Sequence, residues 1–445
     1  MEKETYDFDL FALHDESRDN TSRKFIMCTG KNVKSELRKH ITKIVGNGIS
    51  RYKLHLMLQK KLKISSANAQ RLVYLRRDWY PLVFVKEILN MASASEKEFQ
   101  EHIEFLKCNQ PPVRVVKAVK KLSENLCKVA GAHAADGTML DSYICITDEH
   151  KANIESFKNW IENEFQIKLS PVIKVKNSNE WKLPFHNKII TRYFNRFFGF
   201  PSGKKVYAVK EPEIIKNSTL NFRKAFVLGA LTFEAGVGIK HQVEFCVSSK
   251  AFRDSMTEIL NLSGVKIKVM DRISGTYWRF WSNSLTKEDA EKWLQFFEPY
   301  TEKWFKLYEY VNGFQGKITQ TNDAIKSLDY VFGTKSSSKV CIKDIINILL
   351  NLKESYRYDL VERLAKLNSL DSYGGKWAHS ISHYINILER SNIIRKEKRR
   401  FDKKKSFGTI VRDVYILNED IESWRVPYRS CLESEIKYSN LQEIK

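Results

Sequence analysis

The chain has 445 residues, of which 42% are hydrophobic and 29% charged, a composition that indicates a globular protein of several domains and excludes a disordered one. Its 75 Lys and Arg against 53 Asp and Glu give a formal net charge of +22, so we expect a polyanionic partner, nucleic acid before an anionic membrane. The sequence has no long apolar run, no signal peptide and no P-loop. Its seven scattered cysteines form no Cys-x-x-Cys pair, which predicts a cytoplasmic protein without a zinc ribbon or a disulfide framework.

The first 108 residues contain a pair of predicted helices rich in basic residues. Apolar spacing predicts a helix over 52–62, a break at 63–66 in which Ser66 caps the next helix, and a second helix over 67–77 that ends before Pro81. Two helices joined by so short a turn indicate a DNA-binding helix-turn-helix. A plain helical hairpin with solvated Lys and Arg is the alternative.

The middle of the chain, from about residue 111 to 316, repeats one pattern of elements. The predicted elements of the first copy are a helix over 115–135, a strand over 142–147, a helix over 152–165, strands over 171–176 and 180–185, and a helix over 188–198. Those of the second copy are a helix over 221–234, a strand over 241–247, a helix over 250–262, strands over 265–269 and 276–281, and a helix over 287–297. Both copies predict the order αββαββα, with one of the first two strands poorly marked in each.

Each repeat opens with a helix that ends in an acidic residue. The first ends Val-Ala-Gly-Ala-His-Ala-Ala-Asp-Gly over 129–137, and the second ends Val-Leu-Gly-Ala-Leu-Thr-Phe-Glu-Ala over 227–235. These segments resemble the motif of the LAGLIDADG homing endonucleases, and the resemblance covers about residues 111–297. Its matching positions are Ala130, Gly131, Ala135, Asp136 and Gly137 in the first copy, and Gly229 with Glu234 at the acid position in the second, where Ala235 replaces the last glycine.

The two acids are the candidate catalytic and metal-binding residues. Small residues such as Gly131 on one face would let a second helix backbone approach closely, bringing Asp136 and Glu234 together. Two carboxylates at the negative ends of helix dipoles favour a bound cation, and their hard oxygens suit Mg²⁺. With the backbone of Gly137 and Ala235, they would form the metal site that the resemblance implies. The alternative reading of Asp136-Gly137 is a helix C-cap with a left-handed glycine, and both readings can hold together.

The resemblance also implies a basic residue near each active centre, at the end of the fourth strand. Lys188 occupies that place in the first repeat and would stabilise developing negative charge. In the second repeat the equivalent place falls near Asn283, Ser284 and Lys287. His133, inside the first motif, is expected to pack in the helix interface rather than to act as a base.

Strand alternation predicts sheets with an apolar face and a basic face. The basic face would grip DNA phosphates, whereas an ordinary solvated face usually carries mixed signs. The predicted DNA-binding residues are Lys174, Lys176, Lys182, His186, Lys240, Lys266, Lys268 and Arg279. The resemblance implies that the two sheets form a saddle in the major groove.

The last part of the chain, from about residue 321, predicts three helices over 341–352, 356–367 and 376–391, then strands over 392–400 and 408–416 around a basic turn at 402–405. That order is typical of a winged helix, whose third helix would enter the major groove. The candidate base-reading residues are Trp377, His379, Ser380, Ser382, His383 and Tyr384. His379 and His383 are more readily polar-face residues than a metal pair.

The sequence therefore predicts an α+β protein with four parts: a helical domain over 1–108, repeats over 109–200 and 201–320, and a winged-helix-like domain over 321–445. We expect a monomeric, Mg²⁺-dependent, site-specific endonuclease acting on double-stranded DNA, with no membrane association. A catalytically inactive DNA-binding transcription regulator and an RNA-splicing maturase are the alternatives.

Overall fold

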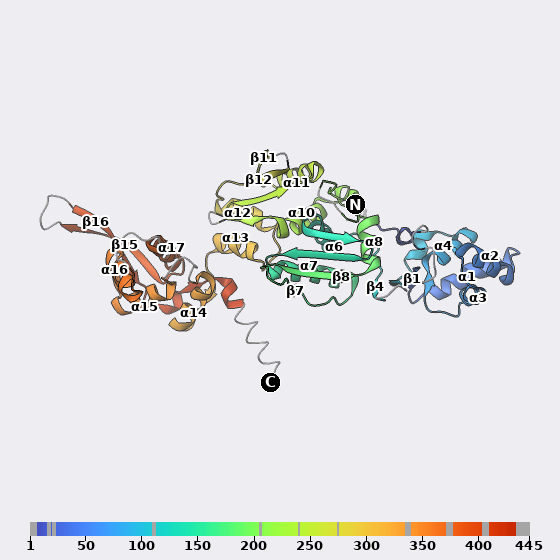
Figure 1. Ribbon diagram of the computed structural model, residues 1–445, viewed down its shortest axis with the longest axis horizontal. Helices are drawn as coiled ribbons and strands as arrows, with labels where there is room; N and C mark the ends of the chain where they lie inside the picture. Colours follow the sequence, from blue (N-terminus) through green and yellow to red (C-terminus); the bar gives the residue numbers. More distant parts are fainter. Residues whose placement is uncertain are drawn as a thin grey trace, which may run out of the picture. The chain divides into compact units, whose positions relative to one another are not determined.

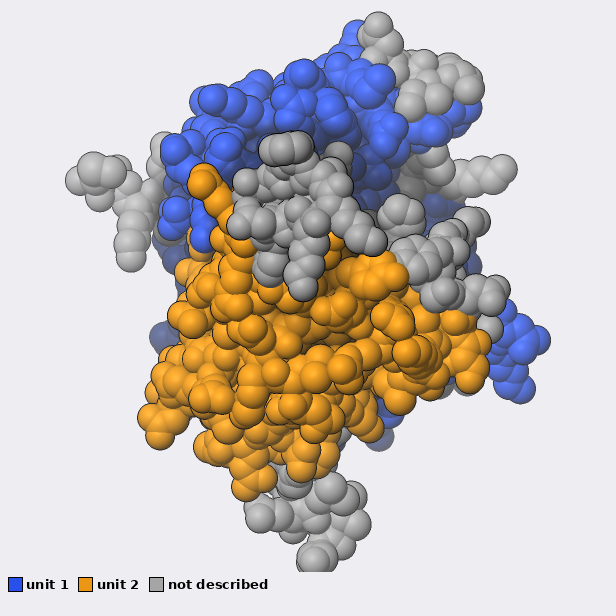
Figure 2. All heavy atoms as spheres, turned by 90° about the vertical axis from the view of Figure 1, so that its left-hand side faces the viewer, with its two compact units in different colours: residues 1–304 blue, residues 305–445 orange. Residues whose placement is uncertain are grey.

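The computed structural model describes residues 7–15, 19, 24–108, 113–203, 207–238, 241–273, 276–333, 340–370, 377–402 and 409–432. They form a mixed fold of helices and small antiparallel sheets (Figure 1). The chain is divided into two compact units, residues 1–304 and residues 305–445 (Figure 2). No helix within the described ranges is long and apolar enough to cross a membrane.

The N-terminal part contains a sheet as well as the predicted helices. Its elements are η1 (Leu10–Leu13), β1 (Ile26–Thr29), α1 (Val33–Gly46), α2 (Arg51–Leu62), α3 (Ser66–Val73), β2 (Tyr80–Pro81), α4 (Leu82–Met91), α5 (Glu96–Gln100), β3 (Phe105–Cys108) and β4 (Val115–Lys117). The strands pair antiparallel in the order β2-β1-β3-β4. The prediction of a helical domain over 1–108 therefore missed this sheet.

The predicted helix pair is present, with different ends. α2 breaks at Lys63, which adopts a left-handed φ of 51°. Ser65, not Ser66, caps α3, and its Oγ accepts a hydrogen bond from the Asn68 amide at 3.3 Å. α3 ends at Val73, four residues before the predicted end, because Leu75 turns left-handed with a φ of 52°.

The first repeat begins later than predicted. Its elements are α6 (Glu124–Asp136), β5 (Gly137–Leu140), β6 (Tyr143–Asp148), α7 (Lys151–Phe165), β7 (Ile173–Lys174), β8 (Trp181–His186) and α8 (Lys188–Arg196). Residues 115–117, predicted as helix, are strand β4, in which exposed and buried side chains alternate. The helix starts only after Ser123, whose Oγ accepts from the Leu126 amide at 3.2 Å.

The second repeat follows the same plan after the short helix α9 (Glu213–Lys216). Its elements are α10 (Leu220–Glu234), β9 (Gly236–Val237), β10 (Val243–Val247), α11 (Lys250–Leu262), β11 (Lys268–Ile273), β12 (Tyr277–Trp281) and α12 (Lys287–Leu294). The sheet orders are β5-β6-β8-β7 and β9-β10-β12-β11, so corresponding strands occupy corresponding places. β11 lies about three residues later than predicted, and its Val269 is exposed rather than buried.

The second unit begins within α13 (Glu302–Asn312), and its described residues include three short strands that the sequence did not predict. Its elements are β13 (Gly316–Lys317), α14 (Thr321–Phe332), α15 (Ile342–Leu352), β14 (Glu354–Tyr356), α16 (Arg357–Leu367), α17 (Trp377–Arg390), β15 (Ile394–Asp402), β16 (Thr409–Leu417), η2 (Ile421–Ser423) and β17 (Arg425–Val426). β14 adds to the predicted β15–β16 hairpin in the order β14-β16-β15. A core of aliphatic and aromatic side chains joins these helices to the hairpin.

Candidate active site and nucleic-acid interface

The helices α6 and α10 touch backbone to backbone at a pair of glycines (Figure 1). A Cβ placed on Gly131 would lie 1.9 Å from the carbonyl oxygen of Phe226, and a Cβ placed on Gly229 would lie 2.0 Å from that of Lys128. Gly131 and Gly229 are 98 positions apart in the sequence, and so are the two residues that they contact, Lys128 and Phe226. Each helix therefore presents the same contact to the other. This reciprocity is what an approximate two-fold axis between the two repeats requires.

The two helices run in the same direction. Ser123, which caps the start of α6, donates to Glu164 near the end of α7 at 2.7 Å, so α7 runs antiparallel to α6. Asn153, at the start of α7, donates to the carbonyl of Thr232 near the end of α10 at 2.9 Å. The C-terminal ends of α6 and α10 therefore both lie beside the first turn of α7.

Each helix ends on one of the two predicted acids. Asp136 is exposed and Glu234 is half-buried, and each lies five residues beyond its contact glycine. The chain then enters a sheet at once: Gly137 has φ −75° and ψ 144°, and Ala235 has φ −80° and ψ 145°. Gly137 is therefore the C-cap residue of α6, but the left-handed conformation in the alternative reading of Asp136-Gly137 is wrong. Glycine is required there for space, since a Cβ would lie 2.1 Å from Nδ1 of His133.

The donors at this end of the helix pair fit a hard divalent cation. Carboxylates at the negative ends of two parallel helices attract positive charge. Within the described ranges, no group of three or more His, Cys, Asp or Glu side chains could hold a metal ion. An ion held by Asp136 and Glu234 would thus take its remaining ligands from backbone oxygens, water or a bound phosphate, as Mg²⁺ commonly does.

Lys188, the predicted basic residue of the first centre, is engaged with the N-terminal region. Its ammonium forms an ion pair with the buried carboxylate of Asp19 and donates to the carbonyl of Lys24 at 3.1 Å. Arg192, one turn later on α8, lies 3.4 Å from Asp19 and 3.1 Å from Asp15. The role of Lys188 near Asp136 stays a prediction.

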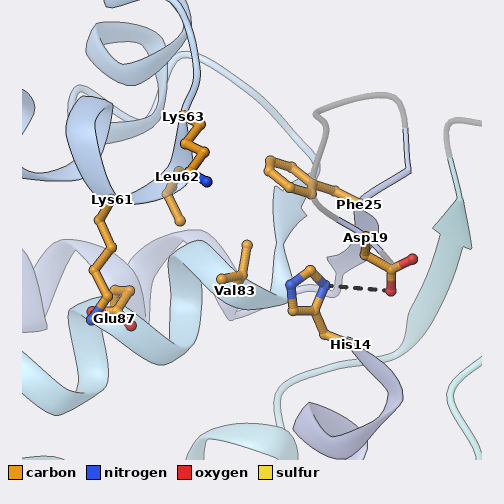
Figure 3. A pocket seen from close by; sticks show the side chains of 8 residues that line it. All are labelled: His14, Asp19, Phe25, Lys61, Leu62, Lys63, Val83 and Glu87. Atoms are coloured by element: carbon orange, nitrogen blue, oxygen red, sulfur yellow. Dashed lines mark ion pairs between the residues drawn. The ribbon is translucent and has the colours of Figure 1, made fainter. Parts of the chain in front are cut away.

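Asp19 also lines a cavity of about 220 Å³ (Figure 3). His14 lies 3.7 Å from Asp19 on its wall, and Lys61 pairs with Glu87 at 2.6 Å. The remaining lining side chains are Phe25, Leu62, Lys63 and Val83. Sequence reasoning did not predict this cavity, because residues that line it come from segments far apart in the chain.

In the first sheet, the predicted lysines divide between the two faces. Lys182 and His186 alternate with the buried Leu183 and so lie on the open face. Lys174 pairs in register with Trp181, on the opposite face. Its ammonium lies 5.7 Å from the centre of the Trp181 ring. The strand pattern suggested lysines on one shared face, and the register of β7 against β8 overturns this for Lys174.

In the second sheet, Lys268 and Arg279 share the open face. Lys268, Arg279 and Trp281 are neighbours there by register, and the ammonium of Lys268 lies 5.7 Å from the centre of the Trp281 ring. Glu244 on the same face forms an ion pair with Arg279. Phe245 and Phe280 stack at 4.3 Å on the opposite face. Lys176 and Lys266 are exposed beside the strands, and Lys240 lies outside the described residues.

This division predicts unequal effects of two lysine substitutions. We expect Lys268→Gln to weaken binding to a DNA duplex about threefold to tenfold, because its charge lies on the open face. Lys174→Gln should change the binding less than twofold, because the register of β7 places Lys174 on the face opposite the open one. Fluorescence anisotropy with a labelled duplex measures both. Equal losses would contradict the assignment of one open face.

The predicted readers of α17 are partly core residues. Tyr384 is fully buried and Trp377 is 9% exposed, so neither is the exposed reader that was predicted. Ser382 accepts a hydrogen bond from Arg357 at 2.7 Å, Ser380 is half-buried and His383 is exposed. The side chain of His379 and the turn at 403–408 lie outside the described residues.

His133 and the loop before α12 complete the predicted set. His133 is fully buried, and its ring centre lies 4.8 Å from that of Phe194 on α8. Its expected place in the interface between α6 and α10 stays a prediction. Asn283, Ser284 and Lys287 are exposed. The sequence did not predict a role for Lys303, a buried residue of α13 whose ammonium contacts the end of α10.

No family model matches the chain, and no curated protein matches it either. Similar solved structures include the homing endonuclease I-DmoI in complex with DNA and Mn, at 17% identity, covering 36% of this chain and 89% of that one, with a TM-score of 0.28. Full-length DUF199/WhiA from Thermotoga maritima has 11% identity, covers 60% of this chain and 92% of that one, and has a TM-score of 0.30. The N-terminal LAGLIDADG domain of DUF199/WhiA has 11% identity, 45% and 84% coverage, and a TM-score of 0.28. These low-identity likenesses assign the chain to no family.

Proposed function

We propose that the chain is a monomeric, site-specific double-strand DNA endonuclease of the LAGLIDADG type, with Asp136 and Glu234 as its two metal-binding acids. The observation that carries the proposal is the reciprocal glycine contact between two parallel helices that each end on a carboxylate. A helix interface that served stability alone would not require an acid at the same end of both helices.

Some of these side chains would bind DNA, and others would take part in cleavage. Lys182, Lys268 and Arg279 on the open sheet faces would hold phosphates and set the register of the duplex. Asp136 and Glu234 would hold a divalent cation, which supplies charge stabilisation at the phosphodiester. Because there are two acids in two similar repeats, one chain would serve a pseudo-palindromic site without a partner subunit.

The second unit supports a further DNA contact. Its order α15-β14-α16-α17-β15-β16, with β14 completing a three-stranded sheet, is typical of a winged helix. We propose that α17 and the β15–β16 hairpin add affinity. On the hairpin, Arg395, Lys398, Arg400 and Arg412 are exposed, and Arg399 pairs with Glu354 at 3.0 Å.

A cleavage selection tests the proposed function. The full chain is incubated with a random duplex library with and without Mg²⁺, and cut ends are captured and sequenced. We expect a single preferred site that is cut only with the metal. Specific binding without cleavage would favour the inactive regulator, and activity on structured RNA alone would favour the maturase.

We also expect the affinity for DNA to fall steeply with salt, because each neutralised phosphate releases counterions. Six to ten phosphate contacts would lower the affinity by roughly a thousandfold or more between about 50 and 200 mM salt. Anisotropy titrations of one labelled duplex over that range give the slope. A flat response would contradict phosphate binding by the basic faces.

A further inference from the structure

A buried lysine closes the end of the helix that carries Glu234. Lys303 is 6% exposed, and its ammonium donates to the carbonyl of Thr232 at 2.6 Å and to that of Phe233 at 3.0 Å. These are the two carbonyls that directly precede Glu234 in the chain. Burying an ammonium is costly unless its donors are satisfied, so its position is specified by the fold.

The segment that brings Lys303 to this place is tied to both repeats. Glu298 accepts from Lys128 of α6 at 2.9 Å and from Trp160 of α7 at 3.1 Å. Its backbone amide donates to Thr232 Oγ of α10 at 3.4 Å, and its carbonyl accepts from Thr301 at 2.7 Å. Lys303 lies two residues after Thr301, so these hydrogen bonds hold its backbone beside α6 and α10.

We propose that Lys303 is the positioning residue of the Glu234 centre: its ammonium offsets the negative end of α10 and, by binding the carbonyls of Thr232 and Phe233, holds the last turn that carries Glu234. The inference rests on the proposed nuclease function. A cation at a helix C-terminus stabilises the helix and any nearby carboxylate.

Other charged groups also face Glu234. Cys246 of β10 lies nearby: burial raises the pKa of its thiol, and the charge of Glu234 raises it further. Arg279 and Glu244, which pair with each other, flank Cys246 on the sheet. Substitutions at Lys303 leave these groups in place, so a change at the end of α10 would report the loss of the ammonium.

The first experiment measures strand-specific cleavage under single turnover, with the selected duplex labelled on each strand. In Lys303→Met, we expect one strand to be cut at least tenfold more slowly, so that nicked duplex accumulates, while the other changes less than threefold. Lys303→Arg should recover most of the rate. Asn153→Ala is the matched control, because it removes a neutral donor to the same Thr232 carbonyl, and both its rates should stay within twofold.

The second experiment does not depend on cleavage. Amide hydrogen exchange of the full chain, followed by mass spectrometry, should be at least about fivefold faster at the C-terminal turn of α10 in Lys303→Met than in the wild type, with the end of α6 changed less. If Lys303→Met does not fold, Lys303→Gln replaces it. Identical exchange at the end of α10, or a strand bias equally strong in Asn153→Ala, would overturn the inference. A wild-type chain that never cuts would instead refute the nuclease function.

Discussion

Asp136→Asn and Glu234→Gln will each abolish double-strand cleavage and leave DNA binding within about threefold. Both changes keep the size of the side chain and remove its charge, so the loss falls on the cation and the phosphodiester rather than on packing. Because Asp136 is exposed and Glu234 is half-buried, neither substitution should unfold the helix pair. Cleavage of the selected duplex with Mg²⁺ and anisotropy of the same duplex measure the two properties.

Glu149→Gln is the matched control for these variants. Glu149 is an exposed acid in the same repeat, in the turn between β6 and α7. We expect it to cut at the wild-type rate. Full cleavage by a chain that carries both Asp136→Asn and Glu234→Gln would refute the site. A loss of binding equal to the loss of cleavage would show that the two acids maintain the folded structure instead.

Gly131→Ala and Gly229→Ala will each lower the stability of the first unit. At either position the new methyl group would lie about 2 Å from a backbone carbonyl oxygen of the other helix, and backbone cannot rotate away as a side chain can. We expect a loss on the order of 3 kcal/mol, at the severe end of overpacking, and a fall of roughly 5–10 °C in Tm. Differential scanning calorimetry of the full chain gives the values.

The double variant shows whether the two contacts act as one interface. Because both substitutions push the same helices apart, the double variant should lose less stability than the sum of the losses in the two single variants. Gly46→Ala is the control, since a Cβ at this last residue of α1 meets no atom within 4 Å. Its Tm should stay within about 2 °C of the wild type. A Gly131→Ala variant as stable as this control would contradict the close helix contact.

Much of the local structure follows from the order of residues. The helix and strand periods predicted most of the elements in both repeats, because amphipathic alternation depends on which side chains the local backbone exposes. Errors fell where a tertiary contact decided the outcome. Residues 115–117 pair with β3 as a strand, and the sequence did not predict β14, a three-residue strand held by the hairpin beside it.

The sequence by itself determined the repeat, the small-residue helices and the acid at the end of each, because these depend on residue type and spacing. The tertiary structure alone decided which side chains meet. The register of β7 placed Lys174 on the face of Trp181, the N-terminal region brought Asp19 to Lys188, and the segment after α12 brought Lys303 to Thr232. Such contacts join residues far apart in the chain, and their geometry is set by packing, which local spacing does not encode.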